Sequence, residues 1–376
     1  MREIHVFFDN TYYTFAWLQP LFEAKKYFKK LGYHINFSRL DIVNIFLKKS
    51  LISQLKKEKS YDIVVLAIHH KSELGRIGTD QRRLILENIK EKCNKLVWMD
   101  CSDSTGTCMF DVLDVVDLYL KKQILKDKHL YTNQFKGQRI HTDYYYKTFH
   151  LSAPSNETEV FWIADVTNLS KIDVSWNISF WNNIRTGMIS RIKKLLSLDS
   201  LNLKGRYTDF EEKNITLFFN GTCPKEENAI SFQRLKVFSE VEQYNDSKYI
   251  VERNKISRKS YELNMRSSKF VISPFGWGEI CNRDFEAFLF GSCLIKPTVN
   301  HLETFPNLFI ENETYIPIDW DFQNFKKILY FLSTAEGQSL GKNIAKKGND
   351  LFVYYRKNKG SLLAEHIVDV FSKHNI

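Results

Sequence analysis

The chain has 376 residues, of which 43% are apolar and 26% are charged, and its formal net charge is +10. This composition excludes a chain that is disordered throughout, because disordered chains lack so much aliphatic and aromatic material. The length exceeds what one hydrophobic core usually supports, and it predicts two domains. The positive charge favours anionic partners, namely nucleotide phosphates, anionic lipids, acidic glycans or nucleic acid, without choosing among them.

The sequence contains no run of apolar residues long enough to cross a bilayer, and its first ten residues lack the apolar core of a secretory signal. Its six cysteines form no CxxC pair, which suits reduced thiols and argues against a zinc site. We therefore expect a cytoplasmic protein. Four lysines on one predicted helix form either an ordinary solvated face or a surface for peripheral contact with an anionic membrane. They are Lys25, Lys26, Lys29 and Lys30.

Short apolar runs alternate with helical patterns in the first third of the chain, which predicts a doubly wound parallel sheet. The predicted strands are 4–8, 34–37, 62–68 and 95–99, and the predicted helices are 18–31 and 81–93. Between about residues 121 and 202 the pattern weakens and aromatic residues are dense, so we expect the end of a domain and a linker there, with a helix at 190–203.

The alternation restarts at residue 215 and predicts a second domain of the same α/β kind. Its predicted strands are 215–219, 249–252, 269–273 and 292–296, and its predicted helices are 231–240, 257–265, 282–290, 322–333 and 362 to the end. We expect domains at 1–200 and 201–360 and a closing helix at 361–376. Two Rossmann-like domains facing each other across a cleft would bind ligands at the carboxyl ends of their strands.

The segment from Ser267 to Pro297 carries most of the chemical information. A strand ends in a loop with Gly276 and Gly278, and a helix then begins near Asn282. Glycines allow close backbone approach, and the amides at a helix start favour phosphate. Arg283 in the first helical turn would bind a diphosphate, and Glu286 would accept hydrogen bonds from ribose or sugar hydroxyls. The ordinary alternative is a helix-surface ion pair between these two side chains.

This segment resembles the nucleotide-sugar-binding domain of exostosin-like glycosyltransferases and, more loosely, of other GT-B enzymes. The order S-K-F-x-x-x-P-x-G followed by R-x-x-E-A-x-x-x-G carries the resemblance, which extends over about residues 214–320. It implies a GT-B fold, with an acceptor-side first domain and a donor-binding second domain. It places Arg283 at the diphosphate and Glu286 at the ribose of a UDP-type donor. The other donor-binding residues that we predict, from the resemblance or from the loop's glycines and acidic residue, are Asn220, Gly221, Thr222, Arg253, Lys255, Gly276, Gly278 and Glu279.

The chain departs from the family pattern at two places. Cys281 stands where exostosin-like sequences often have serine, two residues before the arginine. Glu279 and Glu286 are one residue too close together for the paired glutamates of retaining GT-B enzymes. The stereochemical outcome therefore stays open.

The catalytic base must come from the first domain if the second binds the donor. A carboxylate or histidine at the end of a strand can take the proton of an acceptor hydroxyl. Asp100 and Asp103 follow the strand 95–99, and His70 follows the strand 62–68 beside His69. The ordinary alternatives are turn or capping roles for the aspartates and a loop role for the histidine. We expect no metal and no cofactor, with the nucleotide-sugar acting as substrate.

Transfer of a hexosyl group from a nucleotide-sugar, UDP-linked by resemblance, to a glycan or lipid-linked acceptor, as in polysaccharide biosynthesis, is the leading functional prediction. A GDP-sugar transferase of the fucosyltransferase kind is the second. A basic, aromatic-rich nucleic-acid-binding protein is the non-enzymatic alternative, but no recognised nucleic-acid module is present, so we expect no nucleic-acid partner.

Overall fold

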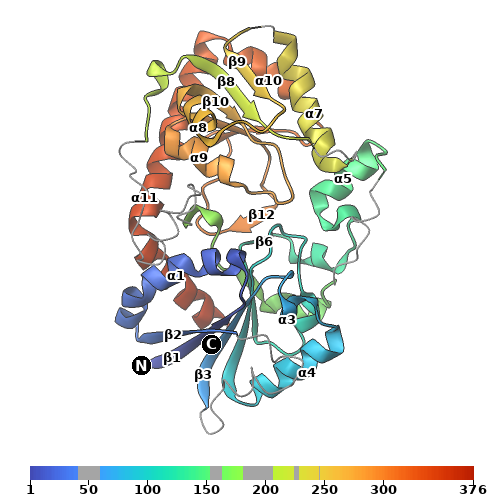
Figure 1. The fold of residues 1–376 in the computed structure, drawn as a ribbon, viewed down its shortest axis with the longest axis vertical. Coiled ribbons are helices and arrows are strands. Elements are labelled where there is room, and N and C mark those ends of the chain that lie inside the picture. Colours follow the sequence, from blue (N-terminus) through green and yellow to red (C-terminus); the bar gives the residue numbers. More distant parts are fainter. Residues whose placement is uncertain (41–59, 153–162, 181–205, 224–227, 245) are drawn as a thin grey trace.

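The computed structural model describes residues 1–40, 60–152, 163–180, 206–223, 228–244 and 246–376. Within these ranges the chain forms two parallel sheets and a two-stranded ribbon between them (Figure 1). The first sheet has the order β2-β1-β3-β4-β5-β7, and the second has the order β13-β11-β10-β8-β9. All strand pairs within both sheets are parallel.

The central strands of the first sheet are apolar and mostly buried on both faces, as parallel strands usually are, whereas its edge strand 33–39 is only partly buried. Helices α1 (Tyr12–Lys30) and α4 (Thr79–Lys90) follow β1 and β3 in the chain. Gly32, at a positive φ of 87°, turns the chain out of α1 into β2. The strands are β1 (Arg2–Phe8), β2 (Tyr33–Arg39), β3 (Tyr61–Ile68), β4 (Cys93–Asp100), β5 (Leu118–Lys121) and β7 (Ile172–Val174).

The second sheet repeats this plan. Its strands are β8 (Ile215–Asn220), β9 (Tyr249–Glu252), β10 (Ser268–Ile272), β11 (Cys293–Pro297) and β13 (Tyr315–Ile318). Its helices are α7 (Ala229–Val241), α8 (Arg258–Ser267), α9 (Asn282–Phe290) and α10 (Phe325–Leu332). Gly291 ends α9 in the left-handed conformation with φ 70°, the helix C-cap expected of glycine there.

Three segments cross between the two halves of the chain. Strand β6 (Gln123–Leu125) pairs antiparallel with β12 (Leu302–Thr304). Helix α5 (Ile140–Thr148) lies beside α7, and its Tyr145 and Tyr146 pack in the core of the second sheet (Figure 1). Helix α11 (Ala335–Lys373) runs along one side of both sheets. The packing of the two sheets is therefore reinforced by shared elements.

Most of the predicted elements are confirmed within a few residues, and α9 and β9 have the predicted bounds. One prediction was wrong: the last helix begins at Ala335 and not near 362. Its final turns pack against β1 and α1 of the first core, through Leu363, Ile367 and Phe371. Strands β5, β6, β7, β12 and β13 and helix α5 were not predicted. The predicted helix at 190–203 and the predicted boundary at 200 lie outside the described residues, and the domain limits stay a prediction.

Among the described helices, none has both the length and the apolar content that a membrane crossing requires. Lys25 and Lys26 lie over the rings of Phe37 and Tyr27 of the first domain.

Candidate functional site

The N-terminus of α9 is held in place by a buried acidic side chain. Asp284 is fully buried and accepts a hydrogen bond from the amide of Cys281 at 3.0 Å and another from the hydroxyl of Ser273. Its third partner is the buried ammonium of Lys296, with Nζ 3.1 Å from Oδ2. Because the first-turn amides of a helix have no partner within the helix, Asn282 and Arg283 present theirs at this end. The loop after β10 therefore supplies a rigid, electropositive helix start.

Arg283 points from α9 to the loop that follows β8. Its Nη2 donates to the carbonyl oxygen of Asn220 at 2.7 Å, and its guanidinium carbon lies 5.2 Å from the ring centre of Phe219. Its Nε is buried and has no hydrogen-bond partner among the described residues. Arg234 of α7 donates to the carbonyl of Thr222 in the same loop. Two arginines thus surround the carboxyl end of β8.

The loop after β8 passes close to a buried aromatic ring at Gly221. A Cβ atom on Gly221 would lie 2.6 Å from the ring of Phe219. The amide of Gly221 donates to the carbonyl of Glu252 at 3.1 Å, and the Asn220 side chain donates to Glu252 and Asn254 carbonyls at 3.0 and 2.9 Å. The predicted triplet Asn220, Gly221 and Thr222 is therefore tied to the end of β9.

Glu286 faces α8 rather than Arg283. It is 3% exposed, and its two carboxylate oxygens accept hydrogen bonds of 2.7 Å from Arg258 and 2.7 Å from the hydroxyl of Tyr261. Burial raises the pKa of Glu286, although Arg258 opposes the shift. No ion pair joins Arg283 to Glu286 in the described part of the chain, so the simple helix-surface pair is not formed.

Arg253 and Lys255, the other basic residues predicted to bind the donor, lie just after β9. Arg253 is exposed and makes a bidentate ion pair with Glu242, with Nη2 2.8 Å from both carboxylate oxygens. Lys255 is exposed on the loop after β9. The guanidinium of Arg253 is therefore already neutralised, whereas those of Arg283 and Arg234 have no carboxylate partner among the described residues.

The loop between β10 and α9 also reaches the first domain. Gly278 lies against Asp103 and Ser104: an added Cβ would be 3.4 Å from the Ser104 amide and 3.8 Å from the Asp103 Cβ. Gly276 has open space at its Cβ position, and its amide donates to the carbonyl of Gly278 at 3.2 Å. Trp277 between these glycines is half exposed, with the guanidinium of Arg139 5.5 Å from its ring centre.

Glu279 is a buried contact between the two domains. Its carboxylate accepts hydrogen bonds from the amide and hydroxyl of Thr105, at 3.1 and 2.7 Å, and from the Gln123 side chain at 3.2 Å. Nδ1 of the buried His141 lies 3.6 Å from the same carboxylate. Burial alone would raise the pKa of Glu279, but His141 and Thr105 outweigh it and hold the pKa below its ordinary value. Its predicted role at the donor stays a prediction.

Asp100 is buried among the groups that neutralise it. Lys121 donates to its carboxylate at 3.0 Å, Tyr119 donates through its hydroxyl, and the amide of Ser102 donates at 2.8 Å. Burial by itself would raise the pKa of Asp100, but Lys121 and these hydrogen bonds lower it. Asp100 is 1% exposed, and its predicted base role stays a prediction.

Asp103 and His70 lie nearer the surface. Asp103 is exposed, and its Oδ1 accepts a hydrogen bond of 2.7 Å from Lys122, which holds the pKa of this carboxyl below its ordinary value. Nδ1 of His70 lies 3.0 Å from the hydroxyl of Ser102, and burial lowers the pKa of His70 to about 4. At neutral pH, Asp103 is thus ionised and His70 neutral, and both are able to accept a proton.

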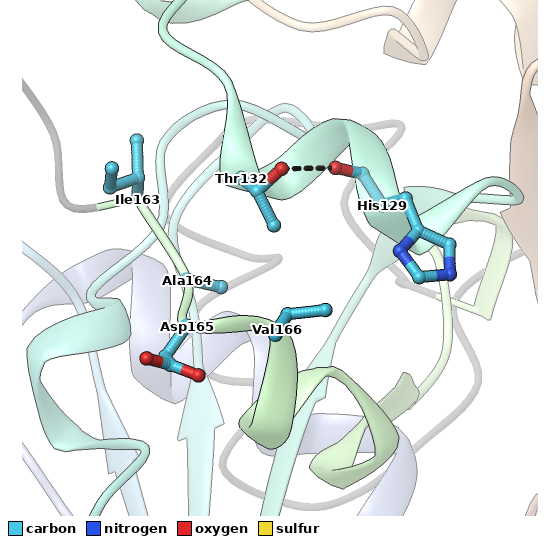
Figure 2. A pocket seen from close by; sticks show the side chains of 6 residues that line it. All are labelled: His129, Thr132, Ile163, Ala164, Asp165 and Val166. Carbon is cyan, nitrogen blue, oxygen red and sulfur yellow. Dashed lines mark hydrogen bonds between the residues drawn. The ribbon is translucent and has the colours of Figure 1, made fainter.

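A separate hollow of about 520 Å³ lies away from the strand ends, between 3-10 helices η3 (Lys128–Thr132) and η6 (Val166–Lys171) (Figure 2). Its lining residues are His129, Thr132, Ile163, Ala164, Asp165 and Val166. The hydroxyl of Thr132 is turned to the carbonyl of His129, with which it forms a hydrogen bond of 2.8 Å. None of the predicted donor or catalytic residues contributes to this hollow.

The chain forms two Rossmann-like domains whose strand ends meet through the loops carrying Thr105 and Glu279, which is the arrangement expected of a GT-B fold. No family model matches the sequence. No curated protein matches it either.

Several solved structures have a similar arrangement of the chain. HepE from Anabaena in complex with UDP is 9% identical, covers 99% of this chain and 100% of its own, and has a TM-score of 0.46. An alpha-glucosyltransferase in complex with UDP and a DNA containing an HMU base is 12% identical, with 98% and 99% covered and a TM-score of 0.45. Sucrose-phosphate synthase from Thermosynechococcus elongatus is 9% identical, covers 99% of this chain, and has a TM-score of 0.44.

Proposed function

We propose that this chain is a glycosyltransferase that moves a sugar from a nucleotide-sugar donor, UDP-linked in preference, to a hydroxyl of a glycan or lipid-linked acceptor. The observation that carries the proposal is the position of Arg283, a half-buried guanidinium with an unpartnered Nε at the N-terminus of α9. A diphosphate there would receive hydrogen bonds from the guanidinium and from the first-turn amides. The preference for UDP rests on the sequence resemblance.

The leaving group of the reaction is a nucleoside diphosphate, and its charge grows as the bond to the sugar breaks. Fixed cations and helix dipoles stabilise such charge without reorganising, which is the role a divalent metal has in other transferases. Arg283 and the start of α9 would supply this stabilisation, so we propose metal-independent transfer. Glu286, beside Arg258 and Tyr261, would accept hydrogen bonds from the ribose once the donor is bound.

Asp103 is the base that we propose for the acceptor. The acceptor oxygen would attack the anomeric carbon, the bond from that carbon to the diphosphate would break, and the acceptor proton would pass to Asp103. Two observations support this choice over Asp100: Asp103 is exposed, and it lies beside Gly278 of the loop that leads into α9. His70 would be the second candidate, because its imidazole is neutral at pH 7.

The test is a thermal-shift panel of UDP, GDP, CMP and ADP and their common sugar conjugates. Wild type, Arg283→Ala and Arg253→Ala would be compared, because a ligand that binds only the folded chain raises its melting temperature. We expect one nucleoside diphosphate to stabilise wild type and Arg253→Ala but not Arg283→Ala. Stabilisation by GDP alone would indicate that the donor is a GDP-sugar and not a UDP-sugar. A flat response of wild type to the whole panel would refute the transferase proposal and favour the basic-surface alternative.

A further inference from the structure

Two arginines from different helices bind the same short segment, residues 220–222 at the end of β8. Arg283 of α9 donates to the carbonyl of Asn220, and Arg234 of α7 donates to the carbonyl of Thr222. Gly221 makes this possible, because any larger residue would press its Cβ into the ring of Phe219. The segment 220–222 thus presents two carbonyls to two guanidinium groups at one end of β8.

These two positive charges are close enough to oppose each other. Burial lowers the pKa of Arg234, and the positive charge of Arg283 lowers it further. Neither guanidinium has a carboxylate within ion-pair distance among the described residues, and Nε of Arg283 is buried without a partner. Placing like charges together in a partly buried site costs free energy, since neither burial nor repulsion is compensated. Such an arrangement is typical of a site that receives an anion.

The neighbouring Arg253 shows what a structural arginine looks like in the same region. It is exposed, it makes a bidentate pair with Glu242, and it lies over the ring of Phe238 at 4.3 Å. Its charge is neutralised and its donors are occupied. Arg253 therefore has little capacity left for a ligand, and it is the natural control for Arg234.

We infer that Arg234 is the second diphosphate ligand of the donor site, acting together with Arg283. The inference rests on the proposed function, since it names the phosphate-binding group of the same site. A guanidinium has five N–H donors, and the bonds to the loop use one from each arginine. The others remain for phosphate oxygens, so each arginine would bind one phosphate group without releasing the loop. The bound diphosphate would neutralise the two charges.

The alternative is that Arg234 only anchors the loop. The bond from Arg234 to Thr222 is lost in any Arg234 variant, so the two roles are separated by ligand affinity and not by ligand-free stability. If Arg234 binds phosphate, replacing it weakens UDP and pyrophosphate binding more than UMP binding. If Arg234 is only an anchor, UMP and UDP lose affinity to the same extent.

The experiment measures UDP, UMP and inorganic pyrophosphate binding by calorimetry on the full chain. The proteins are wild type, Arg234→Gln, Arg234→Lys, Arg283→Ala and the control Arg253→Ala. Loss of a charge-assisted pair of hydrogen bonds to the diphosphate lowers the affinity for UDP by roughly 10- to 100-fold. We expect this loss in Arg234→Gln for UDP and pyrophosphate, a smaller loss for UMP, partial recovery in Arg234→Lys, and no change in Arg253→Ala.

Two results would overturn the inference and leave the proposed function intact: wild-type UDP affinity in Arg234→Gln while Arg283→Ala fails to bind, or equal loss of affinity for UMP and UDP in Arg234→Gln. Absence of UDP binding by wild type, with no other nucleotide bound, would remove the proposed function and this inference together.

Discussion

The carboxylate of Glu279 accepts hydrogen bonds from both the amide and the hydroxyl of Thr105, a residue 174 positions earlier in the chain. Glu279 lies in the loop between β10 and α9, and Thr105 lies in the loop after β4, so the contact joins the carboxyl ends of the two sheets. Both residues are buried. The loop between β10 and α9 is therefore positioned by the first domain as well as by its own strand and helix.

Replacing Glu279 should loosen this junction. We expect Glu279→Ala to lower the free energy of unfolding by roughly 2–4 kcal/mol, because the donors of Thr105 and Gln123 would be left buried without an acceptor. Urea unfolding measures the loss. Glu313→Ala is the matched control: its exposed ion pair with Lys347, at 3.6 Å, should contribute less than about 1 kcal/mol. Equal stability of the two variants would contradict the buried contact.

Asp100 and Lys121 form a buried pair whose removal should affect folding. Lys121→Met leaves the carboxylate of Asp100 buried without its cation, which costs roughly 3–5 kcal/mol. The double variant Asp100→Leu, Lys121→Met should regain much of that loss, because no charge remains unpaired. Chemical unfolding of the three proteins tests this. If Asp100→Asn kept wild-type stability and lost only turnover, the base role would return to Asp100.

Asp103→Asn should remove turnover but leave the affinity for the donor nucleotide unchanged. The expected loss is roughly 10²- to 10⁴-fold in kcat, the usual contribution of a general base, with UDP affinity within about twofold of wild type. Sugar transfer from the donor identified by the thermal-shift panel provides the rate. Asp80→Asn, an exposed aspartate in the first turn of α4, is the control. If turnover is unchanged in Asp103→Asn, Asp103 is not the base, and the same substitution test would be made at His70.

Three buried or partly buried histidines should make the protein less stable in mild acid. Burial lowers the pKa of His69, His70 and His301 from 6.5 to about 4. Between these pH values the unfolded chain binds more protons than the folded chain, so stability falls as pH falls from 6.5 to 4. One such group contributes on the order of 2 kcal/mol to the loss.

His301 offers a clean test of this pH dependence. It lies against the aromatic rings of Trp320 and Phe275, so His301→Phe fits its surroundings. We expect the difference in unfolding free energy between pH 7 and pH 4.5 to shrink in this variant and to stay the same in the exposed control His34→Asn. A difference that is unchanged in His301→Phe would assign the acid sensitivity to other groups.

The sequence predicted the strands and helices that have strong local patterns. Buried parallel strands such as β3 and β10 are continuous apolar runs, and α9 lies between a capping position and Gly291. Strands β5 and β7 were missed because they span four and three residues and include Lys121 and Asp173, charges that are compensated only in the folded chain.

The predicted start of helix α11 was too late in the sequence, because the buried face of this helix packs against different cores along its length. Near its start Gly341 packs against Phe270 of the second core, and near its end Phe371 packs in the first core. No single amphipathic pattern describes a helix that serves two cores. Polar residues and glycines also interrupt the apolar spacing that a sequence-based prediction uses.

For the candidate site, the sequence by itself determined the order of its parts: a strand, a glycine loop, a helix start with Arg283, and Glu286 on that helix. Local spacing carries this information, since strand, loop and helix are neighbours in the chain. Only the tertiary structure decided which charged side chains have compensating partners and which do not. Arg253 is neutralised by Glu242 and Asp100 by Lys121, and Glu279 is hydrogen-bonded by Thr105 of the first domain, whereas Arg234 stands beside Arg283. These outcomes depend on partners far apart in sequence, because electrostatic energy follows distance in space.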